Sequence, residues 1–119
     1  MLQTKGTEII QANTAKFTEV MQGVSKASLW GKANSDHGSF TRLKAGLKTP
    51  MHTHTYDVRI VVISGTLIHG DSEGNETRLG PGSFCNTPAG EKHTTGCTAD
   101  SPCLFYEEQP GEFDLNPVR

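Results

Sequence analysis

The sequence lacks a long hydrophobic run and lacks an excess of charge of either sign. Its longest apolar runs have only four residues, as in Ile60–Ile63, whereas a transmembrane helix needs roughly 20 apolar residues. The 119 residues include 11 Lys and Arg against 13 Asp and Glu, a net charge of −2. The basic residues are scattered singly, so they form no stripe that could follow a phosphate backbone. We therefore expect neither a membrane nor a nucleic acid as a partner.

A secretory leader and a full set of paired cysteines are also lacking. Residues 1–5 have no apolar core of the kind that a signal peptide needs, which predicts a cytoplasmic protein, or a periplasmic one if a leader has been removed. Three cysteines are an odd number and do not make a fully paired secreted scaffold. Cys97 and Cys103 lie six positions apart across a turn with Pro102. They are either bonded to each other or buried free thiols.

Glycine and proline, in contrast, are plentiful. The 13 Gly and 6 Pro divide the chain into segments of strand length. Alternating or β-branched segments predict strands at about 39–44, 58–63, 66–69, 83–86 and 103–107, with a hairpin loop over 70–76. Residues 8–21 have too patchy a pattern for a helix, so strand and loop are favoured there. The sequence predicts one all-β domain: an N-terminal arm over about 1–28, a barrel over 29–109 and a tail over 110–119.

Histidines gather at two places that follow Gly-Pro turns. His52 and His54 are two residues apart and would project from the same face of a strand. His93 follows a second turn, Pro88-Ala89-Gly90. Three neutral imidazoles converging inside a barrel suit a divalent ion such as Fe, Zn, Mn, Ni or Cu. The pattern favours a mononuclear metal site on His52, His54 and His93.

The spacing of these residues resembles the two motifs of the cupin superfamily. Gly46, His52, His54 and Gly65 match the first motif, and Gly82, Pro88, Gly90 and His93 match the second. The resemblance implies a double-stranded β-helix, a jelly-roll barrel, with the metal in its mouth on the three matched histidines. The segment over 29–66 is also similar to uncharacterised bacterial cupins related to the metal-binding cupin of an anti-sigma factor.

The sequence departs from the cupin pattern where a glutamate ligand is expected. Val58 and Arg59 occupy the positions at which the family places that carboxylate, and Cys97 stands in place of the Asn that ends the second motif. Three outcomes stay open: a three-histidine site with open positions, a site that recruits Asp57, Cys85 or His69 as a further ligand, or a site that has lost its metal. Strand alternation places Asp57 on the face opposite His52 and His54.

Few residues besides the histidines are candidates for the pocket. Tyr56 shares the parity of His54 and either lines the pocket as a hydrogen-bond donor or sits at its rim. Cys85 lies within a strand that leads to His93, and its thiol faces either the barrel or the outside. Glu107 and Glu108 must face opposite ways, and whichever faces inward is an acid–base candidate.

Two classes of function fit these residues. The first is a metal-dependent enzyme acting on a small organic molecule, with dioxygenase-like or isomerase-like chemistry. The second is a non-catalytic module that binds or senses a small ligand through the same metal. Because small cupins commonly pair through their outer sheets and terminal strands, the resemblance also implies a homodimer.

Overall fold

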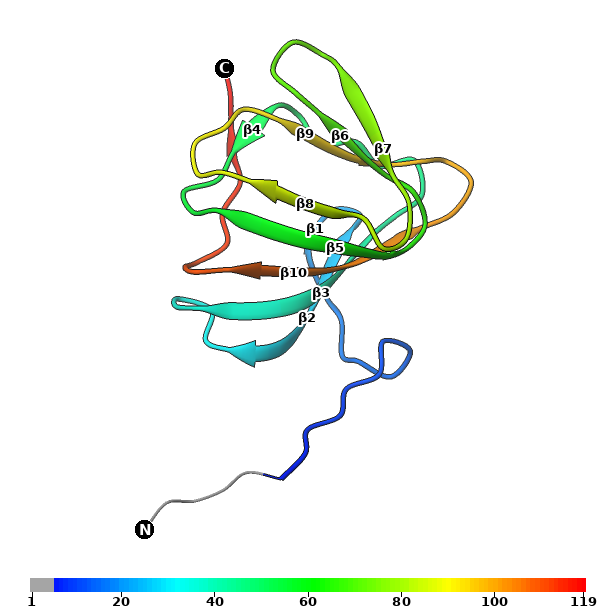
Figure 1. The fold of residues 1–119 in the computed structure, drawn as a ribbon, viewed down its shortest axis with the longest axis vertical. Helices are drawn as coiled ribbons and strands as arrows, with labels where there is room; N and C mark the ends of the chain where they lie inside the picture. Colours follow the sequence, from blue (N-terminus) through cyan, green and yellow to red (C-terminus); the bar gives the residue numbers. More distant parts are fainter. Residues whose placement is uncertain (1–5) are drawn as a thin grey trace.

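The computed structural model describes residues 6–119, which form eleven β-strands and no helix. The larger sheet has six antiparallel strands in the order β1-β2-β3-β10-β5-β8 (Figure 1). Their bounds are Thr18–Met21 (β1), Val24–Gly31 (β2), His37–Leu43 (β3), Cys103–Gln109 (β10), Val58–Ser64 (β5) and Phe84–Thr87 (β8). The all-β class predicted from the sequence is confirmed.

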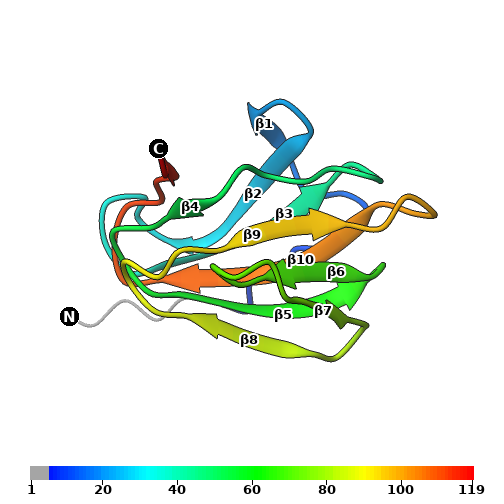
Figure 2. The same cartoon turned by 90° about the horizontal axis from the view of Figure 1, so that it is seen from above.

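A second layer faces this sheet and completes the barrel (Figure 2). It contains β7 (Glu76–Leu79), β6 (Leu67–Gly70) and β9 (Thr94–Cys97), with the two-stranded pair β4 (His52–Thr53) and β11 (Asn116–Pro117) beside them. Two isolated bridges, Lys48 with Gly96 and His52 with His93, connect the chain around β4 to the chain around β9. The second layer therefore carries the histidines on its inner side.

Alternation along the strands determines what fills the barrel. In β5, Val58, Ile60 and Val62 are buried, whereas Arg59 and Val61 are exposed. The buried hydrophobic core is formed by residues of β2, β3, β5, β6, β9 and β10, namely Val24, Leu43, Val58, Ile60, Val62, Leu67, Cys97, Cys103 and Phe105. Cys97 and Cys103 are bonded to each other as a disulfide, with their Cα atoms 6.0 Å apart. Of the two alternatives for these cysteines, a disulfide or two free thiols, the structure contains the disulfide.

The termini differ from the arm and tail expected from the sequence. The sheet begins at Thr18 rather than near residue 29, because β1 pairs with β2 and β2 pairs with β3 along its length. Of the expected arm over 1–28, residues 1–5 lie outside the described residues, and 6–17 form no strand or helix. The expected tail does not extend away from the barrel, since β11 folds back onto β4.

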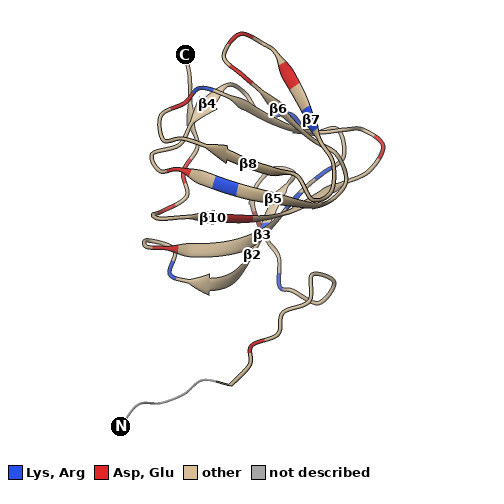
Figure 3. Ribbon diagram, viewed as in Figure 1, with Lys and Arg blue, Asp and Glu red and all other residues tan. Residues whose placement is uncertain are grey.

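Charged residues of both signs are interspersed along the strands and loops (Figure 3). No helix in the described part of the chain is long and apolar enough to cross a membrane.

Candidate metal centre

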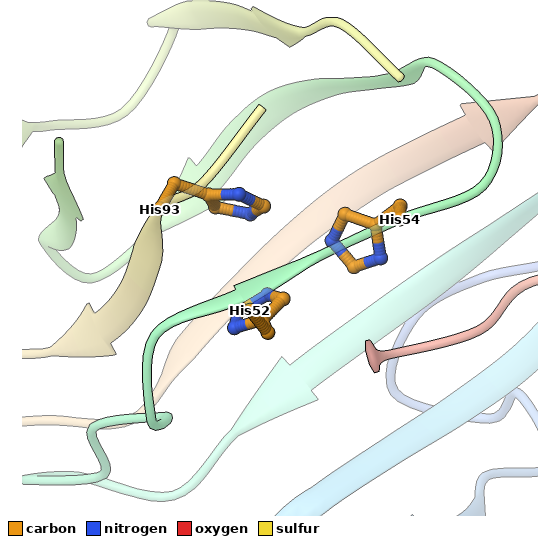
Figure 4. A group of neighbouring side chains, drawn as sticks. All are labelled: His52, His54 and His93. Atoms are coloured by element: carbon orange, nitrogen blue, oxygen red, sulfur yellow. The ribbon is translucent and has the colours of Figure 1, made fainter. Parts of the chain in front are cut away.

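The three histidines predicted as ligands meet in the barrel. His52 and His93 lie opposite each other on antiparallel chains, and each backbone N–H donates to the other's carbonyl oxygen, at 2.9 and 3.0 Å. Residues paired in this way project to the same side, and His54 follows His52 by two positions. One ring nitrogen from each imidazole lies within 4.8 Å of those of the other two. The rings face a common space (Figure 4).

Hydrogen bonds orient all three rings in the same way. The Nδ1 atom of His52 donates to the carbonyl oxygen of Pro50 at 2.7 Å, and that of His93 donates to the carbonyl of Glu91 at 3.1 Å. The Nδ1 atom of His54 donates to the carbonyl of Asp114. Since a carbonyl oxygen only accepts, each Nδ1 carries a proton, and in the neutral ring Nε2 then keeps a free lone pair. Metal-binding histidines are commonly oriented by such bonds.

Burial favours the uncharged form of two of these imidazoles, those of His52 and His93. Desolvation lowers the pKa of His93 to about 4, although its bond to Glu91 opposes the shift. Desolvation also lowers the pKa of His52, and the neighbouring His54 adds to the effect. Neutral imidazoles are the form that binds a metal. The donor set, its spacing and its protonation therefore fit a divalent ion of the Zn or Fe type.

The histidines line a cavity of about 70 Å³ between the two sheets. Its walls are mainly apolar and include Val24, Leu43, Val58, Ile60, Leu67, Leu79, Phe105, Phe113 and Leu115. Besides the histidines, the wall also contains polar side chains. They include Lys26, Thr41, Thr87 and Glu107. Mainly apolar walls interrupted by polar groups are typical of ligand-binding pockets, and the volume of this cavity restricts a ligand to a very small molecule.

Glu107 is the inward member of the Glu107–Glu108 pair. It is 5% exposed, forms an ion pair with Lys26, and accepts a hydrogen bond from Thr41 at 2.7 Å. Burial alone would raise the pKa of Glu107, but the charge of Lys26 and the bonds from Lys26 and Thr41 outweigh it and hold the pKa below its ordinary value. The cavity therefore contains a buried, ionised carboxylate.

Asp57 and Tyr56, two candidates from the sequence, lie outside the cavity lining. Asp57 accepts a hydrogen bond from the backbone N–H of Ala89 at 2.8 Å, so it holds the turn before His93. Tyr56 is 42% exposed, and its ring lies against Gly111.

Cys85 and His69 do line the cavity. The ring of His69 stacks on that of His93 with centroids 5.6 Å apart, but His69 does not belong to the cluster of converging ring nitrogens. Burial raises the pKa of the Cys85 thiol, so the thiol is the favoured form.

The sequence analysis does not identify Lys26 or the residues of the tail as part of the cavity wall. Lys26 was placed within an arm, although its position in the β2 alternation, two residues after the buried Val24, indicates an inward side chain. Phe113 and Leu115 line the cavity from a segment without a strand pattern of its own. The alternation of β3 and β10 could have identified Thr41 and Glu107 as inward-facing residues, but nothing in the sequence reveals that the tail returns.

Comparison with solved structures identifies the same fold in proteins of low sequence identity. The polyketide cyclase RemF from Streptomyces resistomycificus superposes with a TM-score of 0.80 at 19% identity, covering 96% of this chain and 87% of that one. A sugar phosphate isomerase of the cupin superfamily from Silicibacter pomeroyi gives 0.71 at 19% identity, covering 94% and 97%. The DMSP lyase DddQ from Ruegeria pomeroyi gives 0.69 at 23% identity, covering 89% and 61%.

These structures confirm the predicted cupin double-stranded β-helix. The narrower resemblance to an anti-sigma factor's cupin stays a prediction. No curated protein matches the sequence significantly. The model of one family, described as a domain of unknown function (DUF4437), matches residues 7–119, and the chain belongs to that family of cupin-like proteins.

Proposed function

We propose that this protein is a metal-dependent enzyme that moves a proton on a small carbonyl compound, with the isomerase-like chemistry considered in the sequence analysis. The observation that carries the proposal is the buried, ionised Glu107 in the same small cavity as three converging imidazoles. An ionised carboxylate shielded from water can accept a proton, and because the ion pair with Lys26 weakens Glu107 as a base, most of the acidification of the C–H would have to come from the metal. The cyclase, isomerase and lyase with the same fold are consistent with such chemistry.

The side chains of the cavity have different roles in this proposal. The apolar walls exclude water and orient the carbon skeleton of the substrate. A divalent ion on His52, His54 and His93 would polarise a carbonyl oxygen and acidify the neighbouring C–H. With a 2-hydroxy carbonyl compound, Glu107 takes the proton as the C–H bond beside the carbonyl breaks, and the electron pair moves through the C–C bond toward the carbonyl oxygen. The hydroxyl proton passes to that oxygen, and Glu107 returns its proton to the former carbonyl carbon, which leaves the carbonyl on the neighbouring carbon. Lys26 and Thr41 keep the carboxylate ionised between turnovers.

The metal site is tested by elemental analysis of protein purified without added metal or an affinity tag. We expect about one equivalent of Fe, Zn, Mn, Ni or Cu. His52→Ala and His93→Ala should remove it, whereas the control His37→Ala should not, because His37 lies outside the cavity lining. Metal content unchanged in both variants, or less than a tenth of an equivalent after titration of the unaltered protein, would contradict the site.

Proton transfer is tested by hydrogen exchange into substrates. Metal-loaded protein in D₂O is incubated with 2-hydroxy ketones, aldoses and 2-oxo acids, and the loss of C–H signals beside the carbonyl is followed by NMR. Glu107→Gln should slow exchange by about 10²-fold or more. Glu108→Gln is the matched control, since its carboxylate lies on the opposite face and accepts from Tyr106.

The same panel separates the competing functions. Consumption of O₂ without C–H exchange would favour dioxygenase-like chemistry. Saturable binding of a small molecule with neither reaction would favour the non-catalytic binding or sensing module. Exchange that survives Glu107→Gln would assign the proton transfer to another group.

We also propose that the protein is a homodimer. The outer face of the large sheet has exposed apolar side chains, among them Val61, Ile63 and Phe84, and Val61 is paired with Phe84 across β5 and β8. Light scattering should give twice the chain mass of 12.9 kDa. Phe84→Glu should lower that mass, and a monomeric mass for the unaltered protein would refute the proposal.

A further inference from the structure

The C-terminal segment Gly111–Val118, which we call the C-terminal strap, lies against β4 and the residues that follow it, where His52 and His54 lie. Its strand β11 pairs with β4, opposing Asn116 to Thr53 and Pro117 to His52. The backbone N–H of Val118 donates to the carbonyl oxygen of Met51 at 2.9 Å. Figure 2 shows the end of the chain beside β4. The strap is thus part of the wall around the candidate metal centre.

The three imidazoles depend on the strap to different degrees. His52 and His93 donate from Nδ1 to carbonyl oxygens only two residues earlier in the chain. His54 donates to the carbonyl of Asp114, sixty positions away. Two ligands are therefore oriented by their own turns, whereas the third is oriented only when the strap is in place.

A clamp built on the Asp114 side chain holds that carbonyl in position. Its Oδ1 atom accepts from the backbone N–H of Thr55 at 2.8 Å, and its Oδ2 atom accepts from the Thr55 hydroxyl. The Asn116 amide donates to the same Oδ2 at 3.3 Å. Because Thr55 directly follows His54, the clamp connects the strap to the histidine that it orients.

The strap also covers the cavity with apolar groups. Phe113 and Leu115 line it, and the Phe113 ring lies 5.5 Å from the His54 ring between centroids. Lys26 Nζ lies 4.1 Å from the centroid of the Phe113 ring. At the start of the strap, a Cβ on Gly111 would lie 2.5 Å from the Tyr56 ring, so this close approach requires glycine.

We propose that Asp114 is a positioning residue, and that docking of the C-terminal strap completes the metal centre by fixing the third histidine. The inference rests on the proposed metal site. Asp114 acts through His54, holding the Nδ1–H tautomer so that Nε2 keeps its lone pair toward the other two imidazoles. Because coupling between two sites is reciprocal, metal binding must stabilise the docked strap as much as the strap strengthens metal binding.

The test uses full-length Asp114→Ala, with Co²⁺ alone as the probe. We expect a Co²⁺ affinity about tenfold lower or weaker still, which is the usual cost of losing a group that orients a ligand. Asp114→Asn keeps one acceptor for Thr55 and should recover part of the affinity. Asp100→Ala is the matched control, since Asp100 also accepts from a threonine hydroxyl, that of Thr98, in a turn apart from the cavity.

Two further readouts distinguish orientation from general destabilisation. In metal-free protein, nitrogen NMR should show His54 as the Nδ1–H tautomer, and Asp114→Ala should give a mixture of tautomers. Thermal unfolding confirms that each variant is folded, and Thr55→Val, which removes only the hydroxyl bond, gives a milder second variant. On adding Co²⁺ to the unaltered protein, hydrogen exchange of the Val118 amide should slow.

The outcomes separate this inference from the proposed function. If the unaltered protein binds no Co²⁺, the metal site fails, and the tautomer measurement alone decides the role of Asp114. The inference is overturned if Asp114→Ala leaves the His54 tautomer unchanged. It is also overturned if the unaltered protein binds Co²⁺ and Asp114→Ala binds it within twofold of the same affinity.

Discussion

The two ends of the barrel interior are built from different residues, although the same strands form both. Along β10 the buried side chains change from Cys103 and Phe105 to Glu107 and Gln109. In β3 the change runs from Leu43 to Thr41 and Ser39. The register pairs Cys103 with Leu43 and Glu107 with Ser39, so neighbouring strands become polar at the same end of the barrel.

The apolar end resembles an ordinary core, whereas the polar end contains buried polar groups that lower the stability of the fold. Leu67 and Val62 are each 1% exposed, and the disulfide lies at their end. At the other end, Ser39 Oγ and Gln109 Nε2 are buried with no hydrogen-bond partner among residues 6–119. Polar groups buried at the expense of stability are typical of functional sites. The comparison indicates that one end stabilises the fold, and it supports the proposal that the other end is the functional site.

The largest effect is expected from breaking the ion pair at the polar end. Lys26→Met leaves Glu107 buried without its partner and should lower the free energy of unfolding by about 3–5 kcal/mol, measured in urea. Replacing both residues, with Lys26→Met and Glu107→Leu, should recover much of that loss. Lys48→Met is the control, because the Lys48–Glu76 pair is exposed and worth about 0–1 kcal/mol. An equal effect of both single variants would contradict the comparison.

A somewhat smaller loss is expected at the apolar end. Leu67→Ala removes a fully buried side chain and should cost about 3 kcal/mol of unfolding free energy, since a cavity remains. The folded variant should keep its metal stoichiometry. Ile63→Ala, at a side chain that is 41% exposed, should change stability much less. Loss of bound metal from folded Leu67→Ala would show that the two ends do not act separately.

The sequence predicted the parts of this molecule that depend on short-range patterns. Alternation in β5 and β10 identified strands and their inward residues because the two-residue period is local. The spacing of His52, His54 and His93 around two turns predicted a cluster that the structure contains. Alternation also predicted that one of Glu107 and Glu108 faces inward, and in the structure the inward residue is Glu107.

What the sequence could not predict depends on contacts between distant segments. The pairing of β1 with β2 and of β2 with β3 makes part of the expected arm a part of the large sheet. The partner of His54 is a backbone carbonyl, and every residue offers one, so no residue type identifies Asp114. Tyr56 has the parity of a pocket residue, but the chain around it bends away from strand geometry and leaves the side chain largely exposed.

The smallest effect we predict is on the pH dependence of stability between about pH 6.5 and 4, to which His93 at the polar end contributes. The pKa of His93 is about 4 in the folded protein, lowered by burial, whereas an unfolded histidine has its ordinary value of 6.5. Between these pH values the unfolded chain binds more protons, so the free energy of unfolding falls as the pH decreases from about 6.5 to 4. If the whole shift is realised, we expect a loss of about 2.5 kcal/mol in metal-free protein. His93→Gln should make the urea midpoint less dependent on pH over this range, whereas Leu67→Ala should lower it by the same amount at each pH. A slope that His93→Gln leaves unchanged would mean that this imidazole is not kept neutral by burial, and the polar end would lose its main electrostatic distinction from the apolar end.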